Sequence, residues 1–174
     1  RKLLMKRILK TRTGAVVVLF LLISMTAAGC GGGFSVGTKT DALTGLKMNY
    51  KGLSVDDAYL VVDGSKLTSK SVPLGSEVVM LFTGVDNFTE EEGMTYPGAS
   101  MLITGTDGEV LLDMKDLFSQ YDATGVSRED AGTLSLSLSF GNPMVRGGAY
   151  TWESRIWDKK GEGEIKATVK LTAK

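Results

Sequence analysis

The stretch TLSLSLSF, residues 133–140, alternates strictly between an apolar and a small polar side chain over its whole length. Successive side chains of a β-strand point to opposite faces of a sheet, so this period of two predicts a strand with one buried and one solvated face. Gly141-Asn142-Pro143 follows directly and is a turn signal that ends the strand. The stretch therefore indicates a β-protein.

The two segments downstream extend this pattern. Residues 150–157 are rich in aromatic and β-branched side chains and predict a second strand. Asp158-Lys159-Lys160-Gly161 predicts a turn, and residues 162–172 alternate again between apolar and polar side chains. We expect a closing antiparallel hairpin that buries one face and exposes the other to water.

Upstream, short runs of β-branched and apolar residues predict further strands at 46–50, 58–62, 77–82, 100–104 and 109–112. Asp63-Gly64 and Thr106-Asp107-Gly108 predict tight turns between them. Only two helical turns are expected, within residues 115–121 and 127–131, the second with Ser127 as its N-cap.

About eight strands with Gly and Asp turns at short spacing are typical of an antiparallel β-sandwich. We therefore predict an all-β domain over residues 46–174. A small antiparallel barrel is the alternative fold.

The closing hairpin resembles the final hairpin of immunoglobulin-like bacterial surface domains. The resemblance lies in Gly148-x-Tyr150-x-Trp152 and in the turn Asp158-Lys159-Lys160-Gly161-x-Gly163. It implies an immunoglobulin-like sandwich, but the Cys–Trp–Cys signature of true immunoglobulin domains is absent because Cys30 is the sole cysteine.

The first 29 residues have the build of a secretory signal peptide. Residues 15–25 form an apolar block that is shorter than the ~20 residues needed to span a hydrocarbon core. Small residues follow the block, as in a cleaved leader. A basic flank without acidic residues precedes it and contains Arg1, Lys2, Lys6, Arg7, Lys10 and Arg12.

The end of this leader, Ala27-Ala28-Gly29-Cys30, resembles the lipobox of bacterial lipoproteins. The resemblance implies cleavage before Cys30, acylation of its sulfur and a membrane anchor, and Gly31 favours an outer membrane or cell surface. An uncleaved signal anchor and a secreted protein without lipid are the alternatives. Since no second cysteine exists for a disulfide, lipidation also explains why a lone thiol stands here.

Residues 30–45 are dominated by glycine, serine and threonine and are predicted to be a flexible tether. The sequence thus divides into a signal peptide at 1–29, a lipidated tether at 30–45 and a β-sandwich at 46–174.

The charge balance changes once the leader is removed. The whole chain has 20 basic and 20 acidic residues, and six of the basic ones lie in the leader, which leaves 14 against 20. An acidic domain binds phosphate backbones poorly, so we expect no nucleic-acid partner. The membrane contact is expected through the lipid alone.

The chain contains no histidine. This removes the usual general base, the Ser-His-Asp and Cys-His arrangements, and the commonest zinc ligand. The acidic clusters Asp56-Asp57 and Asp86 with 90–92 fit no EF-hand loop, and we interpret them as solvated loop charge rather than as a calcium or glycosidase site. We predict no enzyme, no cofactor, no metal site and no catalytic residue.

Arg155 and Trp157 are the candidate partner contact. In the predicted strand at 150–157 they point away from Ile156, which marks the core side, so we expect Trp157 to be more exposed than Trp152. Tryptophan and arginine are favoured as anchors of interfaces.

We therefore predict a lipid-anchored, non-enzymatic binding or accessory module of a bacterial envelope, with a protein or glycan partner. A structural subunit that assembles by strand pairing is the alternative, and an unpaired, uncharged edge at residues 134–140 would favour it. A hydrolase that works with carboxylates is a third hypothesis.

Overall fold

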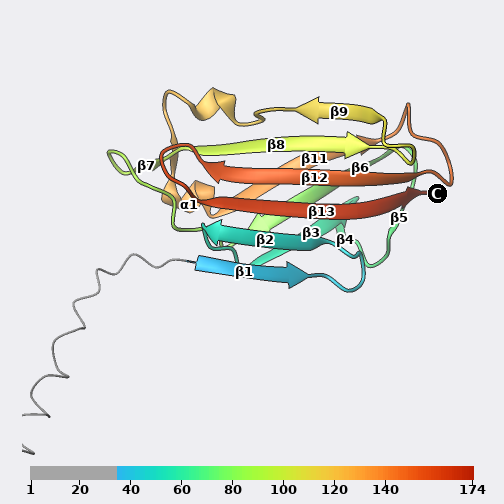
Figure 1. The fold of residues 1–174 in the computed structure, drawn as a ribbon, viewed down its shortest axis with the longest axis horizontal. Helices are drawn as coiled ribbons and strands as arrows, with labels where there is room; N and C mark the ends of the chain where they lie inside the picture. Colours follow the sequence, from blue (N-terminus) through green and yellow to red (C-terminus); the bar gives the residue numbers. More distant parts are fainter. Residues whose placement is uncertain (1–34) are drawn as a thin grey trace, which may run out of the picture. The chain divides into compact units, whose positions relative to one another are not determined.

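The computed structural model describes residues 35–174, in which two β-sheets pack face to face as a sandwich (Figure 1). The larger sheet has seven strands. Six follow the order β1 (Ser35–Thr40), β2 (Lys47–Gly52), β13 (Glu164–Ala173), β12 (Ala149–Asp158), β8 (Pro97–Thr104) and β9 (Val110–Met114). They pair antiparallel, and the short β5 (Ser71–Val72) joins the end of β13 in parallel.

The smaller sheet has four antiparallel strands in the order β11 (Thr133–Phe140), β6 (Ser76–Thr83), β3 (Asp57–Val62) and β4 (Ser65–Lys66). Two further short strands, β7 (Met94–Thr95) and β10 (Val126–Ser127), pair with each other. The described helices are single turns, η1 (Ser119–Tyr121) and α1 (Arg128–Ala131). The prediction of an antiparallel β-sandwich is confirmed.

The core lies between the two sheets and follows the alternation of the sequence. In β11 the leucines and Phe140 are buried and the serines are exposed. From the larger sheet, Trp152 of β12 is only 1% exposed, and the ring of Tyr150 meets Phe140 edge-on at 5.8 Å between centroids. Apolar surface removed from water contributes about 25 cal/mol per Å², so this shared apolar layer is the main source of stability.

Several local predictions are confirmed. The turn at Asp63-Gly64 joins β3 to β4, and the turn before β9 joins it to β8 as a hairpin. β12 and β13 form the closing hairpin. Ser127 caps α1, since its hydroxyl accepts a hydrogen bond from the backbone N–H of Asp130 at 3.0 Å.

The prediction of a flexible tether is wrong for residues 35–45. Residues 35–40 form β1, which pairs with β2 along its full length, and Asp41 begins a hydrogen-bonded turn that leads into β2. The abundant glycine suggested a coil, but a Cβ atom on Gly37 would lie 2.2 Å from the hydroxyl of Tyr50. The glycine therefore makes room for a packed tyrosine on the neighbouring strand.

The signal peptide, Cys30 and the tether up to residue 34 lie outside the described residues. Over residues 35–174, no helix is long and apolar enough to cross a membrane.

Candidate binding face of the larger sheet

The solvent-facing side of the larger sheet, here called the outer face, is formed mainly by β2, β13, β12 and β8, with β9 at one margin. Directly opposed residues of antiparallel strands point to the same side of a sheet. The pairing of β12 with β13 sets Trp157 opposite Glu164 and Arg155 opposite Lys166. The pairing of β12 with β8 sets Trp157 opposite Gly98. Both candidate contact residues therefore lie on the outer face.

Trp157 is partly exposed at one end of this face, whereas Trp152 is enclosed in the core at 1% exposure. The expected difference between the two tryptophans is thus confirmed. The guanidinium carbon of Arg155 lies 5.1 Å from the centre of the Trp157 ring, within the range of a cation–π contact. The structure brings the two predicted residues together.

Glu164 links the charges at this end of the face. Its two oxygens accept hydrogen bonds from Arg155 Nε and Lys166 Nζ, each at 2.8 Å. The hydrogen bond from Lys166, together with that from Arg155, holds the pKa of the Glu164 carboxyl below its usual value. One carboxylate therefore pairs with two cations, and the cluster of Arg155, Glu164 and Lys166 keeps a net positive charge at neutral pH.

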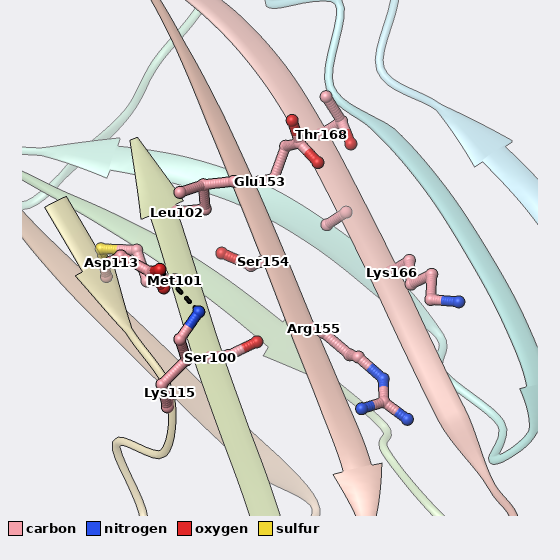
Figure 2. A pocket seen from close by; sticks show the side chains of 11 residues that line it. Ser100, Met101, Leu102, Asp113, Lys115, Glu153, Ser154, Arg155, Lys166 and Thr168 are labelled. Carbon is pink, nitrogen blue, oxygen red and sulfur yellow. Dashed lines mark hydrogen bonds and ion pairs between the residues drawn. The ribbon is translucent and has the colours of Figure 1, made fainter. Parts of the chain in front are cut away.

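A shallow hollow of about 340 Å³ lies across the middle of the outer face (Figure 2). Arg155 and Lys166 reach it from β12 and β13, and Ser100 lines it from β8. Lys115 and Asp113 close it at the β9 side and are joined by an ion pair of 2.6 Å. The hollow is open, and the apolar residues Met101, Leu102 and Ala167 line it together with the charged and hydroxyl-bearing side chains.

The outer face has the opposite charge to the rest of the domain. Its charged side chains are six cations and three carboxylates, while the other described residues have eight cations and seventeen carboxylates. The six cations are Lys47, Lys51, Lys115, Arg155, Lys166 and Lys170, and the three carboxylates are Asp113, Glu153 and Glu164.

The acidic loop clusters lie elsewhere, and most of their carboxylates form ion pairs. Asp86 accepts two hydrogen bonds from Arg128, at 3.0 and 2.7 Å, and this lowers the pKa of its carboxyl. Glu91 forms an ion pair with Lys160 at 2.8 Å. Within the described part of the chain, no group of three or more potential ligands is arranged to hold a metal ion.

No protein-family model matches the sequence. The comparison with curated proteins also gives no match. Among solved structures, the fold is similar to the C-terminal domain of wzt, with a TM-score of 0.50 and 14% sequence identity over 82% of this chain and 78% of that one. This likeness supports the assignment of the fold.

The sequence reasoning found Arg155 and Trp157 but missed their neighbours. It predicted that the polar residues of 164–170 face water, yet it did not place them beside Arg155. The missing information was the register of the closing hairpin, in which Trp157 pairs with Glu164. The contributions of Lys47, Lys51 and Ser100 depend on strand order, which the sequence does not reveal.

Proposed function

We propose that this protein is a lipid-anchored, non-enzymatic binding module of a bacterial envelope, and that its outer face binds an acidic glycan. The lipobox resemblance at Cys30 supports the anchor and the envelope location. The separation of charge carries the binding proposal, because an acidic domain has gathered six of its fourteen cations on one side of one sheet.

The free cations indicate a negatively charged ligand. Lys47, Lys51 and Lys170 form no ion pair with another described residue, although carboxylates are abundant in this domain. Like charges on one side of a surface repel each other. An anion that binds between them lowers this electrostatic energy. Sulfate, phosphate or carboxylate groups on the ligand would supply this charge.

The charges and hydroxyls of the outer face favour a glycan over a protein. Protein interfaces are enriched in aromatic and apolar residues at their centres. Around the hollow, hydroxyls and charges such as those of Ser100, Glu153 and Thr168 are interspersed with the apolar Leu102, and no aromatic residue lines it. These groups donate to and accept from sugar hydroxyls, and Trp157 with Arg155 provides a planar edge at one end.

The test compares dextran sulfate with neutral dextran, which have the same sugar backbone. We expect the protein to bind dextran sulfate and not dextran. Affinity should fall as the salt concentration rises from ~0.01 M to ~0.15 M and the Debye length shortens from ~30 to ~8 Å. The triple variant Lys47→Gln, Lys51→Gln, Lys170→Gln should bind about tenfold more weakly, which corresponds to ~1.4 kcal/mol.

The matched control is Lys70→Gln, Arg146→Gln, Lys174→Gln, which removes the same charge from exposed positions off the outer face. It should bind nearly as well as the wild type. Equal losses in the two triple variants would show that net charge, and not the outer face, controls binding. Release of new reducing ends from the bound polymer would contradict the non-enzymatic part of the proposal.

A further inference from the structure

The second interaction surface is the open edge of the smaller sheet. β11 pairs with β6 on one side and is the terminal strand of its sheet among the described residues. It runs for eight residues without a charge, a proline or a bulge. Native edge strands are normally shortened, charged or distorted, because a regular free edge pairs with other chains.

The backbone of β11 shows which groups are free. The carbonyl oxygens of Gly132 and Phe140 accept hydrogen bonds from residues at the two ends of β6, namely Val85 and Gly75. Backbone groups of alternate residues in a strand point to opposite sides, so the even-numbered residues of β11 face β6. The N–H groups of Thr133, Ser135, Ser137 and Ser139 therefore point to the open edge.

A strip of uncovered apolar surface on β9 lies above this edge. β11 crosses under β12 and β8, since Phe140 packs on Tyr150 and Leu134 lines a hollow with Pro97. β9 lies one strand beyond β8, at the end of the larger sheet (Figure 1).

The inward side chains of β9 are consequently only partly buried. Met114 points inward beside Met101, yet Met114 is 41% exposed and Met101 is 2% exposed. Leu112 points inward beside Ile103 and is also only partly buried, whereas Ile103 is fully buried. The larger sheet thus extends one strand farther than the smaller sheet beneath it.

We propose that an extended segment of a partner protein adds to β11 as a fifth, antiparallel strand of the smaller sheet. Unpaired backbone groups in a row select an extended peptide, because a helix or a lipid chain does not offer the matching donors and acceptors. The absence of charge on β11 selects a neutral segment. The strip on β9 selects apolar side chains at alternate positions, which would cover Leu112 and Met114.

A hollow at one end of the edge fits an anchoring side chain of this segment. It measures about 160 Å³ and lies between Phe118, Tyr121 and Val126 on one side and Thr133 to Ser135 of β11 on the other. Asp130 also lines the hollow, but its aromatic walls and the buried Leu134 favour an apolar group there. This surface belongs to the other sheet, and the proposal is independent of glycan binding on the outer face.

The same overhang argues against a second copy of the protein as the occupant. Two β11 strands paired about a twofold axis would place both larger sheets on one side. Each β9 would then project past its own β11 into the place where the partner's β9 and β8 lie. We therefore expect a second sandwich to clash with β9, whereas a single added strand would fit beneath it.

The experiment uses the full chain in detergent micelles and a synthetic peptide of sequence TLSLSLSF with a short lysine tail. We expect binding, with slowed amide exchange at Ser135 and Ser137. In an antiparallel pair with the leucines inward, the serine N–H groups of the peptide face β11. Methylation of these nitrogens should abolish binding, whereas methylation of the leucine nitrogens should leave it nearly unchanged.

The variants Ser137→Pro and Ser137→Ala form a matched pair on the protein. Proline removes an N–H that points to the open edge and leaves the ladder to β6 intact, so the fold is expected to persist. Binding of the peptide should fall at least about tenfold for proline and stay near the wild-type value for alanine. Should the proline variant fail to fold, the two methylated peptides still test the proposal on wild-type protein.

Three results would overturn the proposal. The first is equal binding of the two methylated peptides, and the second is an equal loss for alanine and proline at Ser137. The third is a dimer of the wild-type chain that forms without peptide and is lost in the proline variant, because a second copy would then occupy the edge.

Discussion

The indole ring of Trp157 occupies the space that a side chain on Gly98 would need. A Cβ atom at Gly98 would lie 2.2 Å from Cε2 of the ring, and the two residues are directly opposed on neighbouring strands. The glycine therefore provides the surface on which the tryptophan lies, and it fixes the position of the aromatic end of the outer face.

Gly98→Ala should displace the ring of Trp157 and cost about 1 kcal/mol, at the lower end of the range for overpacking because a partly exposed ring has room to move. Fluorescence emission should shift to the red as the ring enters water. Gly141→Ala is the control, since an added Cβ there meets no atom within 4 Å. An unshifted spectrum in Gly98→Ala would contradict the packing of the ring on the glycine.

Ser154 of β12 is a polar side chain that lies in the apolar core. It is 5% exposed, and its hydroxyl and the Nε1 of Trp152 have no hydrogen-bond partner within the described residues. A buried polar group without a partner costs stability, so Ser154→Ala should raise the free energy of unfolding by about 0.5–1 kcal/mol. Denaturant titration measures this, and a loss of stability above that of Thr151→Ala, on the solvent side of the same strand, would refute it.

Lys159 of the closing hairpin forms ion pairs with the residues on both sides of η1. Its Nζ lies 2.6 Å from Asp116 and also contacts Asp122, and its side chain is only 16% exposed. Burial alone would raise the pKa of the Asp116 carboxyl, but the hydrogen bonds from Lys159 and from the backbone of Phe118 hold it below its usual value. Lys159→Met should lower the free energy of unfolding by about 1.5–3 kcal/mol at neutral pH.

A carboxyl whose pKa is depressed by folding stabilises the protein above its unfolded pKa of about 3.9. This contribution disappears as the pH falls through the folded value. The difference between wild type and Lys159→Met should therefore be full at pH 7 and shrink below about pH 4. Urea titrations at both ends of this range check the trend, and a constant difference would show that the ion pair is not its source.

Glu164 partly neutralises the positive charge of the outer face, because it pairs with Arg155 and Lys166. Glu164→Gln should leave Arg155 and Lys166 free and increase the affinity for dextran sulfate about two- to fivefold, or ~0.4–1 kcal/mol. Glu77→Gln makes the same change in net charge on the exposed side of β6 in the smaller sheet. Binding should respond to the first variant and not to the second. A response to both would mean that the ligand senses only the total charge.

Cys30→Ser tests the anchor. The resemblance to lipoproteins predicts that the wild-type protein extracted from membranes begins at Cys30 and carries a diacylglyceryl increment in its mass. The serine variant should lose this increment and appear in the soluble fraction, because two acyl chains anchor a protein stably and the variant carries neither of them. A membrane-bound protein with an intact leader would instead support a signal anchor.

The parts of the fold with strong alternation could be predicted from sequence. β11 and β13 each place apolar and polar side chains on opposite faces over at least eight residues, and no helix or loop satisfies that pattern. β1 was missed because its Ser-Val-Gly-Thr-Lys-Thr has no apolar period, and its pairing with β2 depends on a residue in β2, Tyr50, that needs Gly37 opposite.

The candidate site was predictable only in part for a related reason. Local pattern places Arg155 and Trp157 on the exposed side of β12, but it does not identify the strands beside them. Contacts such as Trp157 with Gly98 join residues far apart in the sequence, and strand order and register together determine them.

The early start of β1 changes how near to a membrane the domain would lie. If acyl chains hold Cys30 in a bilayer, only the steps from residue 30 to Ser35 separate the lipid from the first hydrogen-bonded strand. At about 3.4 Å per residue that stretch spans no more than ~17 Å even when fully extended. With this anchor the start of β1 would stay within that distance of the bilayer, so the end of the sandwich that contains Ser35 would lie near the headgroups.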